Sequence, residues 1–266
     1  MEKEFDVAII GGAFSGASAA ILLKRKHPQL RILIIERTEK FDRKVGEATT
    51  EISGRFLTKH LMMTHHLAHH HVAKQGLRIW FTRSEGDSLD DCGEMGAKYN
   101  SRLPSYQIDR EVLDSKILEE AVALGAELWR PAKVQEIETR ESDNELIVQF
   151  GGETHTVRSK WLIDASGRAA VLGRKKKLLE PLTAHPTNSV WARFKSVTDW
   201  DSYKVFSENP NYANASHASR SAATNHLTGY GWWCWIIPLK GGDYSVGIVY
   251  DERLYQLPPG EKLGDR

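Results

Sequence analysis

The sequence predicts an α/β protein built on a parallel β-sheet, and three observations support this prediction. Two short apolar runs, at 6–10 and 31–36, have the composition of strands buried on both faces. The Ala- and Leu-rich stretch at 15–26 between them predicts a helix, so the three segments form a βαβ unit. A third apolar run at 161–164 predicts another buried strand.

The rest of the chain divides into a helical part and a β-rich part. We expect helices at 51–72 and 109–125, a polar loop at 83–100, and strands at 133–139, 145–150 and 155–157. Aromatic-rich segments at 190–194, 232–238 and 244–250 predict strands of a second sheet. We therefore expect a nucleotide-binding domain over 1–185, with a helical insert at about 47–108, and a β-sheet substrate region over 186–266.

Composition narrows the class of protein. The 266 residues are 41% hydrophobic and 27% charged, which is ordinary for a globular chain. A net charge of +1 gives no reason to expect nucleic acid or an anionic membrane as a partner. No apolar run reaches the roughly 18–20 residues of a membrane span. The charged N-terminus lacks the features of a signal peptide, and Cys92 and Cys234 form no framework, so we expect a cytoplasmic protein.

A glycine-bearing turn links the first strand to the first helix. Gly11 permits a tight turn, and Gly16 lets the helix approach the strand closely. Backbone N–H groups at the start of a helix form a site for a pyrophosphate, because the helix dipole favours negative charge there. Ala13 occupies the position where this pattern usually has its second glycine. The turn as a whole consists of Gly11, Gly12, Ala13, Phe14, Ser15 and Gly16.

An acidic residue completes the nucleotide-binding pattern. Glu36 ends the second strand, 20 residues after Gly16, where a carboxylate accepts hydrogen bonds from ribose hydroxyls. A carboxylate there fits FAD or NAD and opposes a 2′-phosphate. The alternative interpretation is a glycine turn with a purely structural role.

Several further motifs follow in a fixed order. They are Glu36-Arg37, Lys44-Val45-Gly46-Glu47-Ala48-Thr49, Asp109-Arg110, Asp164-Ala165-Ser166-Gly167-Arg168 and Gly231-Trp232-Trp233-Cys234-Trp235-Ile236-Ile237-Pro238. With the glycine turn, this set resembles FAD-dependent oxidoreductases of the aromatic-hydroxylase type and, within them, the flavin-dependent (tryptophan) halogenase branch. The resemblance covers essentially the whole chain. It implies a Rossmann-like FAD-binding fold with an added antiparallel β-sheet substrate region.

The resemblance also implies which residues hold the cofactor. Besides the turn, Glu36 and Arg37, it indicates Gly46, Glu47, Ala48 and Thr49 beside the isoalloxazine ring, Arg110 near the phosphates or ribityl chain, and Asp164 and Gly167 at a strand end lining the flavin site. Arg110 at a helix start is disfavoured by the helix dipole unless an anion lies nearby. The alternatives are an exposed cation at Arg110 and a plain turn after Asp164. Thr50-Glu51 stand where the family usually has a proline.

Lys74 is the candidate catalytic residue. The stretch 74–80 resembles the catalytic-lysine segment of the halogenases and begins 28 residues after Gly46. In that family hypohalous acid reaches the lysine, which hydrogen-bonds it or becomes a haloamine and presents electrophilic halogen to an aromatic carbon. An amine suits this role because it is a donor and a nucleophile whose pKa shifts on burial. The alternative is a solvated surface charge.

The Trp-x-Trp-x-Ile-Pro signature supplies a candidate active-site wall. Trp233, Trp235, Ile237 and Pro238 match it, and alternation along a strand places the two indoles on one face. The wall would separate the flavin from the substrate chamber. The alternative is an aromatic core pair.

Histidines at helical spacing raise the question of a metal. His65 and His69, like His66 and His70, are four residues apart, but no glutamate accompanies them as in the metalloprotease motif. We expect a polar helix face and no metal.

These observations predict a halogenase-like enzyme. FADH2, O2 and halide would halogenate a small, electron-rich aromatic substrate, with Lys74 delivering the halogen. No second glycine turn for a nicotinamide nucleotide is visible, so a separate flavin reductase would supply the reduced flavin. The alternatives are an FAD-dependent monooxygenase and a non-catalytic FAD-binding fragment. The family's later Gly-Asp and Phe-Pro-Ser-Gly segments are absent and the chain ends in a charged stretch at 261–266, so we expect a truncated N-terminal portion.

Overall fold

The computed structural model of the chain describes residues 2–82, 88–215 and 218–255. Residues 83–87 of the predicted loop and the charged stretch at 261–266 lie outside the described residues. The chain divides into two compact units, one of residues 1–45 and 110–180 and the other of residues 46–109 and 181–266. The segment that the sequence suggested as an insert in the first domain, at about 47–108, thus groups with the second unit.

The first unit contains a six-stranded sheet in the order β7-β2-β1-β10-β9-β8. Its strands are β1 (Glu2–Ile10), β2 (Ile32–Ile35), β7 (Glu127–Trp129), β8 (Ala132–Thr139), β9 (Asn144–Phe150) and β10 (Glu153–Asp164). β7, β2, β1 and β10 run parallel, whereas β9 and β8 are antiparallel to their neighbours. The predicted parallel sheet is therefore confirmed, with an antiparallel extension at one edge.

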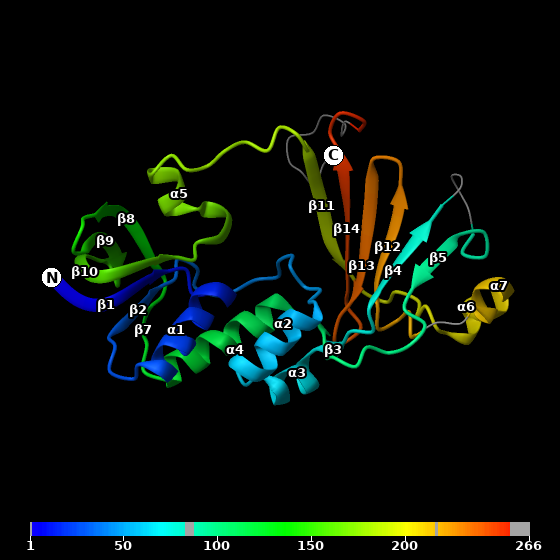
Figure 1. Cartoon of the computed structure of the whole chain (residues 1–266), viewed down its shortest axis with the longest axis horizontal. Coiled ribbons are helices and arrows are strands. Elements are labelled where there is room, and N and C mark those ends of the chain that lie inside the picture. The colour runs from blue at the N-terminus through cyan, green and yellow to red at the C-terminus, as the bar shows by residue number, and fades with distance from the viewer. Residues whose placement is uncertain (1, 83–87, 216–217, 256–266) are drawn as a thin grey trace. The chain divides into compact units, whose positions relative to one another are not determined.

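The predicted βαβ unit is also confirmed. β1 and β2 pair in parallel and are joined by helix α1 (Phe14–Lys26). All four residues of β2 are buried, as expected for a strand covered on both faces. Helix α4 (Arg110–Ala123), predicted at 109–125, buries Leu113, Ile117 and Ala121. It lies beside α1 (Figure 1).

β10 differs from the prediction of two separate strands at 155–157 and 161–164. It is one continuous strand, because residues 153–159 pair with β9 and the overlapping residues 156–164 pair with β1. A short 3₁₀ turn (Gly167–Ala169) and helix α5 (Val171–Lys175) follow it.

The second unit contains another six-stranded sheet, in the order β11-β14-β13-β12-β4-β5 (Figure 1). Its strands are β4 (Leu77–Phe81), β5 (Gly93–Gly96), β11 (Thr187–Phe194), β12 (Thr224–Gly229), β13 (Trp232–Pro238) and β14 (Tyr244–Asp251). All neighbours are antiparallel except β12 and β4. The predicted strands at 190–194, 232–238 and 244–250 are confirmed. β12 escaped prediction because its sequence is polar, and β5 lies in the predicted loop at 83–100.

The helix predicted at 51–72 is not continuous. It consists of α2 (Glu51–Arg55), a π-helical turn (Phe56–His60) and α3 (Thr64–His70). Met62 has a φ of 61°, a left-handed conformation that an α-helix of L-residues does not continue through. The unit is completed by a two-stranded ladder of β3 (Val72–Ala73) and β6 (Tyr106–Gln107) and by the short helices α6 (Tyr203–Glu208) and α7 (Pro210–Asn214).

Candidate functional site

The glycine turn after β1 leaves no room for side chains at two positions. Gly11 has a φ of 100°, and a Cβ there would collide with the carbonyl oxygen of Ala165. A Cβ at Gly16 would collide with the carbonyl oxygen of Gly11. The backbone of β1, the turn and α1 therefore pack directly against one another, which is the close approach that a dinucleotide turn requires.

The N-terminus of α1 offers backbone donors to an anion. Ala13 is the N-cap residue, and it has no side chain that could satisfy the first N–H groups. The first turn carries no acidic residue, whereas Lys24, Arg25 and Lys26 lie in the last turn. Of the other predicted residues here, Gly12 is buried, Phe14 is half-buried and Ser15 is exposed.

Glu36 stabilises the turn through hydrogen bonds. One carboxylate oxygen accepts from the N–H of Gly12 at 2.7 Å, and the other accepts from the N–H and hydroxyl of Thr38 at 2.9 and 2.7 Å. Burial raises the pKa of Glu36, but these hydrogen bonds and the Arg130 guanidinium outweigh burial, so its pKa lies below the ordinary value. The oxygen that faces Gly12 retains a lone pair for a ribose hydroxyl. The neighbouring Arg37 is exposed.

Two cations share one buried carboxylate near the start of α1. Asp114 is fully buried, and its oxygens lie 3.1 Å from the Arg110 guanidinium and 2.6 Å from the Lys44 ammonium. The Arg110 guanidinium also donates to the carbonyl of Val45 and lies 5.8 Å from the ring centre of Phe14, the first residue of α1. The three charged groups together carry one excess positive charge, which favours an anion at this helix N-terminus.

The carboxylate of Asp164 holds the segment that follows β10. It accepts hydrogen bonds from the N–H and hydroxyl of Ser166 and from the N–H of Leu172 in α5. Burial raises the pKa of Asp164, but these hydrogen bonds outweigh it and lower the pKa overall. Gly167 has a φ of 62° with open space around its Cα, so it provides a turn without a bulky side chain.

In the second unit, the predicted segment 46–49 is paired with residues 106–108. Thr49 exchanges hydrogen bonds with Tyr106 through its N–H and hydroxyl, and the N–H of Ile108 donates to the carbonyl of Glu47 at 2.7 Å. An isolated β-bridge joins Ala48 to residue 107. Glu47 and Thr49 are buried, while Gly46 and Ala48 are exposed.

Lys74 is half-buried, and its ammonium donates a hydrogen bond to the carbonyl of Thr49 at 2.9 Å. Burial lowers the pKa of the Lys74 amine, an effect that the carboxylate of Glu51 opposes but does not cancel. A lowered pKa increases the fraction of neutral, nucleophilic amine. Lys74 is therefore not a fully solvated charge, and it lies beside one of the predicted flavin-side residues.

Three residues of the tryptophan signature, Trp233, Trp235 and Ile237, share one face of β13, and Pro238 is the last residue of the strand. The rings of Trp233 and Trp235 lie 5.8 Å apart, and the indole N–H of Trp235 donates to the hydroxyl of Ser245. Trp235 packs over Gly247, where a Cβ would collide with its ring. Trp235 and Ile237 belong to a core cluster, and Pro238 is buried as well, whereas Trp233 is 37% exposed. Trp233 is thus the member of the signature available to a ligand.

His226 is an ionisable residue on the same face of the sheet as Trp233 and Trp235, and the sequence did not indicate it. It is paired with Trp235 across β12 and β13, and its ring contacts Trp233 edge-on at 4.8 Å. Burial and the charge of Lys74 lower the pKa of His226. The polar sequence of β12 gave no strand signal, so the alternation that brings His226 to the tryptophans was not visible.

Arg193 is a second residue that the sequence did not single out. Its guanidinium is buried and lies 2.6 Å from the carboxylate of Glu47 and 3.1 Å from that of Asp109. Burial and the charge of Asp109 raise the pKa of Glu47, and the opposing effects of Ser245 and Arg193 do not cancel this rise. The sequence did contain a signal for Arg193, because it is a single charged residue at the otherwise apolar end of a predicted strand, Trp-Ala-Arg-Phe.

The histidines of α3 stack in pairs at helical spacing. The rings of His65 and His69 lie 4.1 Å apart, and those of His66 and His70 lie 4.7 Å apart. Within the described ranges, no group of three or more His, Cys, Asp or Glu side chains is arranged to hold a metal ion. In the same ranges, no helix is both long and apolar enough to cross a bilayer.

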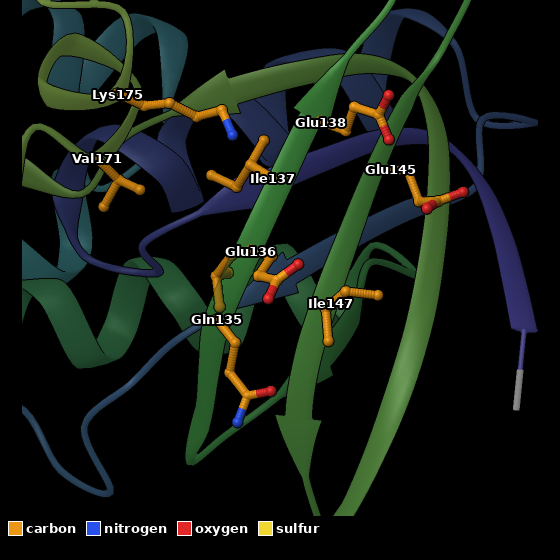
Figure 2. Close-up of a pocket in the computed structure, with 9 residues that line it drawn as sticks. Gln135, Glu136, Ile137, Glu138, Glu145, Ile147, Val171 and Lys175 are labelled. Carbon is orange, nitrogen blue, oxygen red and sulfur yellow. The ribbon is translucent and has the colours of Figure 1, made fainter.

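A cavity of about 500 Å³ lies in the first unit along β8, β9 and α5 (Figure 2). It is lined by Glu136, Glu138 and Glu145, with Lys175 as its cation, and by none of the predicted site residues. Its acidic lining opposes a pyrophosphate. The glycine turn suits a dinucleotide better than this cavity does, because the uncapped N–H groups of α1 and the positive charge of Arg110 and Lys44 lie near it.

The parallel sheet with its glycine turn and acidic strand end, together with the added antiparallel sheet, defines a flavoprotein-like fold. No family model matches the chain. The chain is 30% identical over 284 residues to the flavin-dependent halogenase chlA of Dictyostelium discoideum, an alignment that covers 93% of this chain and 45% of that protein. It is 26% identical over 286 residues to the tetracycline 7-halogenase of Kitasatospora aureofaciens, with 97% and 49% covered.

A solved structure gives the same result for the fold. The crystal structure of halogenase PltM in complex with phloroglucinol and FAD matches with a TM-score of 0.80 at 21% identity, and covers 96% of this chain and 53% of that one. The predicted Rossmann-like fold and the resemblance to flavin-dependent halogenases over most of the chain are thereby confirmed. The chain spans about half the length of the two curated relatives, at 45% and 49%.

Proposed function

We propose that the chain forms the FAD-binding part of an oxidoreductase that halogenates an electron-rich aromatic compound. The observation that carries this proposal is a combination of three features in the first unit. The N-terminus of α1 is uncapped, Arg110 and Lys44 leave an excess positive charge near it, and the carboxylate of Glu36 follows the end of β2. These are the groups that bind a pyrophosphate and a ribose. The halogenase relatives support the chemistry.

The residues present fit FAD. Gly11 and Gly16 leave the backbone bare where a side chain would collide, so a pyrophosphate can approach the N–H groups of α1. Arg110 and Lys44 supply the charge, and Glu36 accepts from ribose hydroxyls. Bound FAD, when reduced, supplies the electrons with which O2 and halide yield hypohalous acid. We assign the segment 46–49 to the flavin-binding residues.

Lys74 delivers the halogen in this proposal. Its partly desolvated amine either donates a hydrogen bond to hypohalous acid or takes its halogen as a haloamine with release of water. The half-exposed indole of Trp233 then forms part of the wall of the substrate chamber. An indole, pyrrole or phenol suits this chamber because electrophilic halogen attacks electron-rich carbon. The PltM structure holds phloroglucinol, a phenol, and this supports the same substrate class here.

Partners and location follow from the same chemistry. We propose that a separate reductase supplies the reduced flavin. We also propose a cytoplasmic location, where such a reductase and NADH are found.

The test is a product assay with the protein expressed from the complete gene. It is incubated with FAD, a flavin reductase, NADH, O2, bromide or chloride, and a panel of indoles, pyrroles and phenols. Mass spectrometry should show the isotope pair of one added halogen, dependent on halide and on flavin. A gain of one oxygen without halogen would assign the protein to the monooxygenases instead. Failure of the purified protein to take up FAD at all would support the non-catalytic fragment.

A further inference from the structure

Arg193 connects three segments of the second unit that are distant in sequence. Its guanidinium, on β11, is 2.6 Å from Glu47, 3.1 Å from Asp109 and 3.9 Å from Asp243 in the turn before β14. Its side chain is 5% exposed, and that of Glu47 is 1% exposed. One buried cation thus faces three carboxylates.

The position of this cation relative to the predicted flavin-side segment is specific. Residues 47–49 pair with residues 106–108, through Ile108 and Glu47 at one end and through Tyr106 and Thr49 at the other. Ile108 and Glu47 form the last pair at one end of this ladder, and Asp109 directly follows Ile108 in the chain. Arg193 contacts both, so it holds the open end of the ladder together.

The other end of the segment is held differently. The ammonium of Lys74 donates to the carbonyl of Thr49. The segment 46–49 is therefore fixed by two cations, Lys74 through the backbone at Thr49 and Arg193 through the side chain at Glu47. A buried carboxylate is costly without its cation, so loss of Arg193 would release Glu47 from its position.

We propose that Arg193 is a positioning residue that fixes the segment 46–49 for flavin binding by pairing its buried guanidinium with Glu47 and Asp109. The part of this inference that concerns flavin rests on the proposed function. The part that concerns the segment itself can be measured on the protein without cofactor.

The experiment compares Arg193→Met with Arg193→Lys and with a control, Arg158→Met. Arg158 is also a strand arginine paired with carboxylates, but its side chain is 44% exposed. Amide hydrogen exchange without cofactor reports on the ladder through the N–H groups of Ile108 and Thr49. We expect Arg193→Met to speed exchange at both at least tenfold, with the β13–β14 amides unchanged. Arg193→Lys should restore part of the protection, and Arg158→Met should leave it intact.

A double-mutant cycle with Glu47→Gln isolates the pair. If Arg193 acts through Glu47, the two substitutions together should raise the FAD dissociation constant no more than the larger single effect, which we expect to be at least tenfold. Additive effects, or unchanged exchange at Ile108 and Thr49 in folded Arg193→Met, would overturn the inference. If Arg193→Met does not fold, Arg193→Lys and Glu47→Gln replace it in the comparison. Both variants must then exchange the Ile108 amide faster than the wild type does, and unchanged exchange would overturn the inference. Wild-type protein that binds no FAD would refute the proposed function, while the exchange data would still decide the role of Arg193.

Discussion

The ammonium of Lys74 donates a hydrogen bond of 2.9 Å to the backbone carbonyl of Thr49. This contact joins two motifs that lie 25 residues apart in the sequence, the candidate catalytic lysine and the segment assigned to the flavin. It gives the amine a defined direction, although the lysine stem is flexible in general.

Lys74→Ala should abolish halogenation and leave oxidation of reduced flavin intact. The proposed function makes the Lys74 amine the group that transfers halogen, so we expect the rate of formation of halogenated product to fall at least about a hundredfold. Product is measured by mass spectrometry, and flavin oxidation by absorbance. Lys59→Ala, which removes an exposed lysine, is the control. Halogenation that continues at the wild-type rate in Lys74→Ala would rule out the lysine as the transfer group.

His226 should report on the charge of Lys74. Burial and then Lys74 lower the pKa of His226 below 6.5. Lys74→Met removes the second cause, so the pKa of His226 should rise towards its ordinary value but remain below it because burial persists. Titration of the His226 ring protons by NMR measures this shift, with Lys59→Met as the control. A pKa that stays constant or falls in Lys74→Met would show that the two groups do not interact.

His71 should make the protein sensitive to mild acid. It is buried, its Nδ1 accepts the N–H of Asp109, and burial, followed by the neighbouring His66, lowers its pKa to about 4. The unfolded chain binds a proton near pH 6.5 and the folded chain only near pH 4, so stability falls as pH drops through this window. The loss amounts to about 3 kcal/mol at about 1.4 kcal/mol per pH unit.

His71→Asn tests this because its side-chain oxygen can accept from Asp109 but does not titrate. Urea unfolding at pH 7 and pH 4 should show a smaller loss in the variant than in the wild type by about that amount. An equal loss in both proteins would place the acid sensitivity elsewhere.

Gly11→Ala should destabilise the first unit more than Gly152→Ala. Both glycines have positive φ, 100° and 84°, so alanine is strained at each by about 1–2 kcal/mol. At Gly152 a Cβ meets nothing within 4 Å, whereas at Gly11 it collides with the Ala165 carbonyl. We expect a total loss of about 2–5 kcal/mol at Gly11. Denaturant midpoints measure the difference, and equal midpoints would argue against a close backbone approach at the turn.

Glu36→Gln should weaken both the fold and FAD binding. The folded-state pKa of Glu36 is lowered, so its carboxylate stabilises the protein at pH values above 4.5 and the benefit is lost as pH falls through the folded pKa. We expect a loss of about 1–3 kcal/mol at pH 7, since its hydrogen bonds involve a charged acceptor. The difference from wild type should shrink at pH 3. Glu39→Gln, at an exposed glutamate, is the control, and an equal effect of both would remove the special role of Glu36.

Local sequence patterns were sufficient to predict an element of the fold wherever the composition of that one segment identifies it as a strand or a helix. The apolar runs of β1 and β2 and the Ala- and Leu-rich α1 predicted the βαβ unit, because buried parallel strands are recognisable by composition alone. The stretch at 51–72 shows the opposite case. Its apolar stripe predicted one helix, but the left-handed backbone at Met62 divides it, and such a break depends on packing that the stripe does not encode.

The sequence by itself determined the glycine turn, the acid at Glu36 and the tryptophan alternation on β13, because each depends on residues within a few positions of one another. Tertiary structure alone decided the rest of the site. It brought Lys74 to Thr49, His226 to the tryptophans and Arg193 to Glu47, and each of these pairs is joined by strand pairing or chain return over long sequence separations. A single sequence records no such pairings, since they result from the packing of whole elements and not from local preference.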